Sequence, residues 1–488
     1  MKVEHIQEPE LEFGNGGRHV DIRFGLMSYG PVDHVRALTS QQIRLGLVGT
    51  TQTLEDVTSW LERCREGIPA KKSNQPNLFP RFPGFGADSC FHASLETEPR
   101  LQRTILQRDL DRIARLSNAN LMVSEAAPLF ASEIQYLAQN ASVDVVICAL
   151  PMDLLDAIQT KSEEEVGHQR RSADGDDVDD GKIRLDLHHE LKARAMAAGR
   201  PIQVVRPDTY DPAKRKRTKR DPSRNRQLQD DATIAWNFHT ALYYKAGGTP
   251  WRLVRDPSDL TACHVGISFY QTLDASKLQT SLAQIFNERG DGIIIRGGQA
   301  SISKEDKRPH LSEEAAHDLL FQALESYRKE HWTLPARVVI HKSSAFTAEE
   351  RAGFQAAIEE QRVASLDMLW LSESFTRLFR TGAYPPLRGT FLSLDDYSHV
   401  LYTRGSVDFF STYPGMYVPV PLRLRCESVA QTPRYLAAEV LALSKMNWNN
   451  TQFDRSDPIT MRAAYQVGNV LKYVGERSQI APRYSYYM

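Results

Sequence analysis

The sequence predicts an α/β protein in which a Rossmann-like domain is followed by an RNase H-like domain. Short apolar runs alternate with amphipathic stretches of helical period through most of the 488 residues, which is typical of strands covered by helices. Near the middle of the chain a helical stretch is broken by Gly247, Gly248 and Pro250, and an apolar strand centred on Ile267 follows. We place the domain boundary at this break. The expected divisions are a lead-in over residues 1–40, a first domain over 41–248 and a second domain over 249–488.

Composition excludes several classes of protein. The formal net charge is −1, so no overall field attracts polyanions, and any nucleic-acid surface must be a local concentration of Lys and Arg. The five cysteines include no CxxC pair and no His/Cys cluster with zinc-ligand spacing, which predicts a reducing compartment and no structural zinc. The amino terminus lacks a signal-peptide core, and no window is apolar enough for a membrane span. We therefore expect a cytoplasmic protein.

The first domain shows the alternation that is typical of a parallel sheet. The expected strands are 43–51, 143–150 and 201–205, and the expected helices are 54–65, 99–118, 182–198 and the stretch that carries Asn237 and Lys245. The lead-in before this domain reads as extended and loop-rich, without a helix. The acidic residues 162–181 lack the spacing of a calcium-binding loop, and their composition predicts a solvated loop.

The second domain combines strands and helices in a different order. Its expected strands are 264–270, 292–296, 337–341, 366–371, 388–394 and 399–403, and its expected helices are 274–287, 312–329, 347–361, 428–445 and 458–473. This order predicts a mixed sheet flanked by helices, consistent with an RNase H-like core.

The second domain lacks residues that RNase H-like cleavage requires. Such nucleases place carboxylates near the middle of the first strand and at the end of a neighbouring strand, because these groups hold two metal ions on the reacting phosphate. Here the two positions carry Ser268 and Ser343, and a hydroxyl cannot replace the charge of a carboxylate on Mg²⁺. The sequence therefore predicts no cleavage at this site. A nuclease that uses displaced carboxylates remains an alternative.

Polar residues of the first domain suggest an anion site. His188 and Lys192 are four apart on one helix, Gln203 lies on the next strand, and Asn237 and Lys245 share one face of a later helix. If these side chains converge, they can hold a terminal phosphate by charge-assisted hydrogen bonds. The same spacing is common on solvated helix faces, so spacing alone leaves both interpretations open.

A basic run precedes the later helix. Residues 214–226 contain eight positive side chains. Six of them are Lys214, Arg215, Lys216, Arg217, Lys219 and Arg220. Such a run either binds nucleic-acid backbone in a salt-dependent way or forms a solvated surface loop.

Four separated segments give the chain a specific resemblance. Residues 244–253 (Y-K-A-G-G-T-P-W-R-L) resemble the junction of the MID and PIWI domains in Argonaute proteins, and residues 337–344 and 446–455 resemble further Argonaute motifs in the same order. Residues 8–31 look like the start of short prokaryotic Argonautes, which lack the N and PAZ domains. The resemblance covers essentially the whole chain and implies a Rossmann-like MID domain followed by an RNase H-like PIWI domain.

The resemblance also implies roles for single residues. The implied pocket for the guide 5′ phosphate consists of His188, Lys192, Gln203, Asn237 and Lys245. The C-terminal carboxylate of Met488 is expected to help hold a Mg²⁺ ion on that phosphate. Slicing Argonautes carry Asp at the positions of Ser268 and Ser343, so an inactive PIWI domain is implied. In this context we expect the basic run to contact nucleic acid.

The implied function is guide binding rather than catalysis. The protein would hold a short 5′-phosphorylated guide RNA and recognise complementary single-stranded DNA by base pairing. Short Argonautes act with an APAZ-containing effector that carries a TIR, sirtuin-like or nuclease domain, so the resemblance implies such a partner, oligomerisation on activation, and defence against plasmids and phage through NAD⁺ depletion. A Rossmann-type regulator of a small ligand is the remaining alternative.

Overall fold

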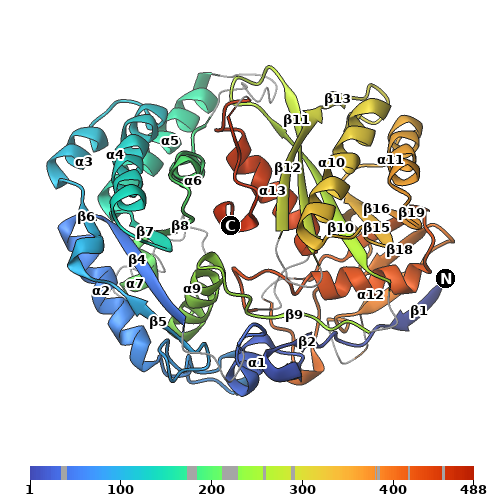
Figure 1. The fold of residues 1–488 in the computed structure, drawn as a ribbon, viewed down its shortest axis with the longest axis horizontal. Helices are drawn as coiled ribbons and strands as arrows, with labels where there is room; N and C mark the ends of the chain where they lie inside the picture. The colour runs from blue at the N-terminus through green and yellow to red at the C-terminus, as the bar shows by residue number, and fades with distance from the viewer. Residues whose placement is uncertain are drawn as a thin grey trace.

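The structure is a computed structural model that describes residues 1–34, 41–172, 184–211, 229–256, 260–286, 292–379, 381, 385–415, 418–452, 457–476 and 478–488. Two sheets with their helices form two lobes, and the C-terminus lies between them (Figure 1). The α/β class and the presence of one parallel and one mixed sheet are as predicted. The domain boundaries at residues 40 and 248 stay predictions.

The first lobe contains a five-stranded sheet in which every pairing is parallel. Its strands are β4 (Gln41–Gly49), β5 (Ala93–Glu96), β6 (Gln102–Thr104), β7 (Val145–Ala149) and β8 (Ile202–Val205). Its helices are α2 (Thr51–Glu66), α3 (Gln107–Ala114), α4 (Ala119–Asn140), α5 (Met152–Ser172), α6 (Leu187–Ala195), α7 (Pro207–Tyr210) and α9 (Asp231–Lys245). Side chains of β7 alternate between two buried clusters, with Val145 and Ile147 in one and Val146 and Cys148 in the other. Both faces of this strand are covered, which explains its continuous apolar run.

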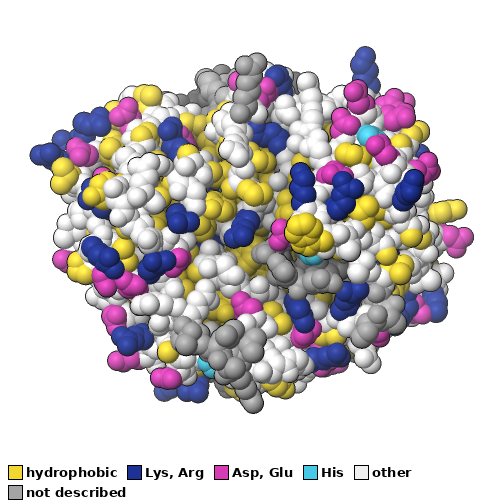
Figure 2. All heavy atoms as spheres, in the orientation of Figure 1, with side chains coloured by type: hydrophobic (Ala, Val, Ile, Leu, Met, Phe, Trp, Pro, Cys, Tyr) yellow, Lys and Arg dark blue, Asp and Glu magenta, His cyan; other side chains and the backbone are white. Residues whose placement is uncertain are grey.

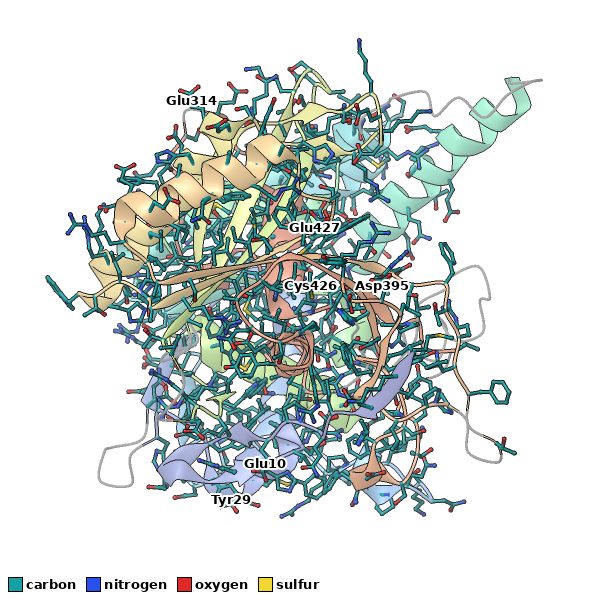
Figure 3. All side chains as sticks on the ribbon, turned by 90° about the vertical axis from the view of Figure 1, so that its right-hand side faces the viewer. Glu10, Tyr29, Glu314, Asp395, Cys426 and Glu427 are labelled. Atoms are coloured by element: carbon teal, nitrogen blue, oxygen red, sulfur yellow. The ribbon has the colours of Figure 1, made fainter. Side chains whose placement is uncertain are left out.

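The second lobe contains a nine-stranded mixed sheet of order β1-β17-β18-β19-β16-β15-β10-β11-β12. Its strands are β1 (Lys2–His5), β10 (Ala262–Gln271), β11 (Leu278–Phe286), β12 (Gly292–Gln299), β15 (Arg337–Lys342), β16 (Ser365–Glu373), β17 (Thr390–Ser393), β18 (Ser398–Leu401) and β19 (Leu422–Ser428). A hairpin of β13 (Ser301–Ile302) and β14 (Pro309–His310) precedes α10. Helices α10 (Glu313–His331) and α11 (Ala348–Gln361) cover one face, while α13 (Ile459–Leu471) packs on β10 and β11 from the other and α12 (Pro433–Leu443) packs beside β19. Figure 3 views this lobe from its outer side, where Glu314 marks α10 and Cys426 and Glu427 mark β19.

One glycine allows α13 to lie directly against the sheet. A Cβ atom at Gly266 would lie 2.1 Å from the carbonyl oxygen of Thr460, well inside van der Waals contact. Further along, a Cβ at Gly468 would lie 3.1 Å from the Cβ of Tyr270. Alternate residues of a strand share a face, so the side of β10 that carries Gly266 and Tyr270 is the side that α13 covers.

The amino-terminal segment is integrated into the second lobe. β1 forms the edge of the nine-stranded sheet by pairing with β17, and β2 (Leu11–Glu12) pairs with both β3 (Arg18–His19) and β9 (Arg252–Leu253). Between them, Glu8 lies 2.8 Å from Arg388 and 3.1 Å from Lys445. Across the described ranges, the search for a helix of membrane-spanning length and hydropathy finds none.

The prediction that the lead-in has no helix is wrong. Helix α1 spans Ile22–Tyr29, and its N-cap, Asp21, accepts from the amides of Arg23 and Phe24. Ile22 and Leu26 are buried in the core that they share with β2. The cap and these two apolar positions are sufficient to stabilise a short helix that turn residues surround.

The predicted loop over residues 162–181 is partly a helix. α5 continues to Ser172 and projects from the body of the molecule in Figure 3. On the described part of its exposed surface, Lys161 pairs with Glu164 at 2.7 Å and Gln159 donates to Glu163 at 2.8 Å. Such contacts three and four residues apart stabilise a polar helix. The remainder, 173–183, lies outside the described residues.

The predicted helix over residues 274–287 is the second arm of a β-hairpin. β11 pairs antiparallel with β10 from Gln271 opposite Leu278 onwards. Asp274 accepts from the hydroxyls of Thr272 and Ser276 at 2.6 and 2.7 Å, and these bonds favour a turn over a helix start.

Two other predicted helices are shorter than expected, for the same reason. Residues 99–118 divide into a 3₁₀ turn, β6 and α3, because 102–104 pair with β4. The helix expected from residue 428 begins at Pro433, because β19 continues to Ser428. In each case pairing with a distant strand overrides local helical period.

Candidate functional site

Helix α6 positions the first residues of the predicted phosphate pocket. Its N-cap is Asp186, whose side chain accepts from the amide of His189 at 2.9 Å. Leu187 and Leu191 pack into the core beneath the helix. Lys192 lies on the helix face next to these leucines and therefore points toward the C-terminal segment of the chain.

Two buried lysines form the centre of the cluster. Lys192 is 4% exposed, and its Nζ donates to the carbonyl oxygen of Tyr487 at 3.1 Å. Lys245, the last residue of α9, is 5% exposed. Its Nζ donates to the carbonyl oxygen of Ile202 at 2.9 Å and to Oε1 of Gln203 at 2.6 Å. All these acceptors are uncharged, and no carboxylate of the described residues pairs with either ammonium group.

The other buried lysines of the described chain have different partners. Lys342 lies 2.5 Å from Glu350, and Lys445 lies 3.1 Å from Glu8. A buried charge is normally compensated in this way, because desolvation without a counter-charge is strongly unfavourable. Lys192 and Lys245 thus form a buried positive site that an anion can neutralise.

The pKa values of the cluster reflect this environment. Burial lowers the pKa of Lys192 to about 7, and the charge of Asp186 acts in the opposite direction. Burial, and then the charge of Lys192, hold the pKa of Lys245 well below its usual value. Burial and the charge of Lys192 also lower the pKa of His188 well below its ordinary range, so its imidazole is neutral at pH 7. A bound anion would favour the charged forms and raise these pKa values.

The chain ends beside the same cluster. Tyr487 and Met488 belong to the buried core, and Met488 is only 2% exposed. The hydroxyl of Tyr486 donates to the carbonyl oxygen of Gly199, just after α6, at 2.9 Å. A terminal carboxylate is a hard oxygen donor of the kind that Mg²⁺ prefers, and Met488 directly follows the carbonyl that Lys192 contacts. These residues fit Mg²⁺ only together with an anion, because two ammonium groups repel a cation.

Asn237 has other partners. Its Oδ1 accepts from the amide and the hydroxyl of Thr451 at 2.8 and 2.9 Å, and its Nδ2 donates to Gln229 at 3.1 Å. A cavity of about 180 Å³ is lined by both Asn237 and Gln203, together with Asn449. The structure thus brings His188, Lys192, Gln203 and Lys245 together, whereas Asn237 shares a cavity with Gln203 alone among them. The basic run from Lys214 to Arg220 lies outside the described residues.

Ser268 lies on β10, and Ser343 directly follows the adjacent strand β15. β10 and β15 run parallel with Ile267 opposite Lys342, so the two serines follow in register. Ser268 is buried on the face that α13 covers, where the neighbouring Ser281 donates to the carbonyl oxygen of Ala464 at 2.8 Å. The sequences of β10, β15 and α13 contain no Asp or Glu. These three elements therefore offer hydroxyl and amide groups but no anionic metal ligand.

No protein-family model and no curated protein matches this sequence. Solved structures do match. They include Clostridium butyricum Argonaute bound to a guide DNA and a 19-mer target DNA (14% identity, TM-score 0.61, covering 97% of this chain and 53% of that one). Drosophila Piwi matches with 13% identity and a TM-score of 0.57, covering 99% of this chain and 56% of that one. Marinitoga piezophila Argonaute, in complex with a 5′ OH guide RNA, matches with 10% identity and a TM-score of 0.57, covering 100% of this chain and 59% of that one.

The chain has an Argonaute-like fold. Its parallel sheet and its large mixed sheet match the MID-PIWI architecture of these proteins. The chain spans a little more than half the length of the Argonaute and Piwi structures that it matches. At these identities the likeness concerns the fold, and the roles of single residues rest on the geometry described above.

In this Argonaute-like fold both lobes contribute to the lysine cluster. α6, β8 and α9 come from the MID-like lobe, while Tyr487 and Met488 follow the PIWI-like lobe in sequence. Figure 2 shows Lys and Arg side chains on both lobes, on either side of a middle region where apolar side chains are visible.

Several residues around the site were missed by sequence reasoning. The hydroxyl of Tyr473, just after α13, accepts from the amide of Asp186 at 2.7 Å. The amide of Thr451 donates to Oδ1 of Asn237. These contacts join positions more than 200 residues apart, and no local pattern signals them. Asp186 was visible as a cap one residue before α6, but its proximity to both His188 and His189 depends on helix geometry.

Proposed function

We propose that this chain is a guide-binding protein of the short Argonaute type, which holds the 5′ phosphate of an RNA guide and pairs the guide with single-stranded DNA. The observation that supports this most directly is the pair of buried lysines, Lys192 and Lys245, whose partners in the described chain are all uncharged. A terminal phosphate supplies up to two negative charges and three acceptor oxygens. It therefore matches the charge and the donors of this cluster.

The chemistry of the 5′ end follows from the lysines rather than from the fold. Marinitoga piezophila Argonaute was solved with a 5′ OH guide RNA, so an Argonaute-like fold alone does not dictate a phosphate. Two ammonium groups with lowered pKa values do favour an anion. In this proposal His188 and Gln203 add hydrogen-bonding groups, and a Mg²⁺ ion with the carboxylate of Met488 neutralises part of the phosphate charge.

The proposed protein recognises its target without cutting it. Base pairing would carry the sequence specificity, and basic side chains, including the run 214–226, would bind the backbone. Absence of Asp and Glu from β10, β15 and α13 supports a silent PIWI domain. In keeping with the resemblance of segments 8–31 and 244–253, activity would reside in an APAZ-containing partner with a TIR, sirtuin-like or nuclease domain, and the complex would act in cytoplasmic defence against plasmids and phage.

The decisive experiment compares guides that differ only at the 5′ end. We expect the full chain to bind a 5′-phosphorylated guide more tightly than the same guide with a 5′ hydroxyl. Lys192→Met and Lys245→Met should each reduce this ratio about 10- to 100-fold, the equivalent of one charge-assisted hydrogen bond. Lys329→Met, at an exposed position on α10, is the control and should leave the ratio unchanged. Equal affinity of the unmodified chain for both guides would overturn the proposal.

Cleavage is tested separately. The guide-loaded chain is incubated with Mg²⁺ or Mn²⁺ and a labelled matched target, and we expect the target to stay intact. A product that depends on guide pairing would establish a nuclease with displaced carboxylates instead.

The identity of the guide is tested by sequencing the nucleic acid that copurifies with the chain. We expect short RNAs with 5′ phosphates. Short DNAs would contradict the assignment of an RNA guide while leaving the phosphate site intact.

A further inference from the structure

A second cluster at the start of α6 has the composition of a metal site. The carboxylate of Asp186 and the rings of His188 and His189 offer one ligand atom each, all within 4.8 Å of one another. Nδ1 of His189 lies 3.2 Å from Oδ1 of Asp186. The two imidazole rings meet edge to face with their centroids 5.2 Å apart. Two ligands of a tetrahedral ion with bonds of about 2.0–2.1 Å lie about 3.3 Å apart, so Asp186 and His189 already have the separation of neighbouring ligands.

Two features distinguish this cluster from an ordinary helix cap. Capping requires only that Asp186 accept from the amide of His189, as it does at 2.9 Å. Nδ1 of His189 is nevertheless buried, and its contact with Oδ1 of Asp186, at 3.2 Å, lacks the geometry of a hydrogen bond. The backbone of Asp186 is also fixed, because its amide donates to the hydroxyl of Tyr473 at 2.7 Å. A buried ring nitrogen beside a fixed carboxylate is the arrangement that a metal ion would satisfy.

We propose that Asp186, His188 and His189 bind a divalent transition-metal ion, Zn²⁺ or an ion of similar preference, at the edge of the lysine cluster. Two imidazoles and one carboxylate suit Zn²⁺, Co²⁺ or Ni²⁺, whereas Mg²⁺ prefers oxygen ligands. This site uses neither the chain end nor Gln203, so it differs from the Mg²⁺ site expected at Met488. Rotation of side chains closes the remaining distances, which do not exceed 4.8 Å.

Histidine binds metal ions in its neutral form, and the environment of His188 favours this form. Burial and the charge of Lys192 keep the pKa of His188 well below its ordinary range. The same lysine repels a cation, but Asp186 offsets this charge.

The ion and the guide would favour each other. A coordination position not taken by protein is open to water or to a phosphate oxygen, and a phosphate would also neutralise the lysines. This coupling rests on the proposed function, whereas binding of the ion itself does not. By linkage, the ion should raise the affinity for a 5′-phosphorylated guide by the same factor as that guide raises the affinity for the ion.

The test begins with the full chain after treatment with a chelator and without guide. Calorimetric titration with Zn²⁺ should show one ion per chain, and Co²⁺ should produce visible absorption bands. Asp186→Asn keeps an oxygen to cap α6, so its loss of metal would not reflect loss of fold. This variant and His189→Ala should each weaken Zn²⁺ binding about 100-fold. Removing a residue that only hydrogen-bonds to a metal ligand weakens metal binding about 10- to 100-fold, so loss of a ligand should cost at least as much.

The matched control is His317→Ala. His317 lies on α10 and pairs with Asp318 and Glu360 at 3.1 and 2.9 Å, so it is another histidine among carboxylates. It should leave Zn²⁺ binding unchanged. An unmodified chain without saturable Zn²⁺ binding, or an Asp186→Asn variant that binds Zn²⁺ as tightly, would overturn the metal site.

The guide assay separates the two proposals. If a chain that binds no Zn²⁺ still prefers 5′-phosphorylated guides, the metal site fails and the proposed function stands. If Zn²⁺ binds but the two guides bind equally, the metal site stands and the proposed function fails.

Discussion

Four lysines are buried in the described chain, and they form two pairs that differ in whether their partners are charged. Lys342 and Lys445 face carboxylates, while Lys192 and Lys245 face only carbonyl and amide oxygens. Removing one partner of a buried ion pair leaves the other charge alone, whereas removing an uncompensated charge relieves a desolvation cost. The same substitution therefore has opposite expected effects at the two kinds of site.

The first prediction compares Lys245→Met with Lys342→Met in the guide-free chain. Lys245→Met should raise the apparent free energy of unfolding by about 1 kcal/mol, because folding no longer has to desolvate or deprotonate an amine whose pKa burial lowers, and this gain exceeds the loss of a donor by two neutral acceptors. Lys342→Met should lower it by about 3–5 kcal/mol, because Glu350 stays buried without a counter-charge. Urea unfolding followed by circular dichroism measures both values. Changes of the same sign would contradict this account of the cluster.

The second prediction concerns pH. In the guide-free chain the pKa of Lys192 is about 7, and a bound phosphate raises it, so binding above pH 7 takes up a proton. Affinity for a 5′-phosphorylated guide should therefore fall by about tenfold per pH unit as the pH rises above 7, and more steeply if Lys245, whose pKa is also lowered, takes up a second proton. Below about pH 6 the phosphate loses its second charge, so affinity should be greatest near pH 6–7. Fluorescence anisotropy at constant ionic strength measures the profile, and a 5′ hydroxyl guide with an identical profile would refute it.

At the scale of elements, local sequence features predicted the long helices correctly. They did not predict strands whose formation depends on pairing with distant residues. All three helices α9, α10 and α11 were predicted, and for α10 the sequence offered the cap Ser312 followed by two acidic residues. β11 was mistaken for a helix because its identity depends on pairing with β10. For the site, spacing placed His188 and Lys192 on one helix face. Their convergence with Lys245 depends on the packing of α6, β8 and α9, which spacing does not contain.

The third prediction tests the close contact between α13 and β10. Gly266→Ala places a Cβ where the carbonyl oxygen of Thr460 lies 2.1 Å away, so the helix or the strand must move. We expect the apparent free energy of unfolding to fall by about 1–3 kcal/mol, as in overpacked cores. Gly86→Ala is the control, since a Cβ there meets nothing within 4 Å. Equal thermal midpoints for both variants would argue against this packing.

At the scale of the molecule, the lobes are joined by the two ends of the chain. The first strand lies at the edge of the large sheet, and the last residues lie beside α6 of the other lobe. The division into domains at residue 248 and the role of Met488 at the phosphate were expected from the Argonaute resemblance, and both stay predictions. The resemblance did not predict the contact of Tyr473 with Asp186, because that contact depends on how the lobes pack.

The fourth prediction compares a short peptide tag at each end. A tag after Met488 must emerge from a residue that is 2% exposed, whereas Met1 is 97% exposed. The C-terminal tag should lower the preference for 5′-phosphorylated guides about tenfold or more, through displacement of Tyr487 from Lys192. The N-terminal tag should leave that preference unchanged. Full preference with a C-terminal tag would show that the chain end takes no part in the site.

The uncompensated charges of Lys192 and Lys245 also bear on how long a copy of the protein survives. A guide whose free concentration is 100-fold above its Kd stabilises the folded chain by about 2.7 kcal/mol. On the proposed function, copies without a guide would open more often and would be degraded first by cellular proteases. The steady-state abundance of the protein would then follow the supply of guides, and unloaded copies would remain scarce without a dedicated surveillance factor.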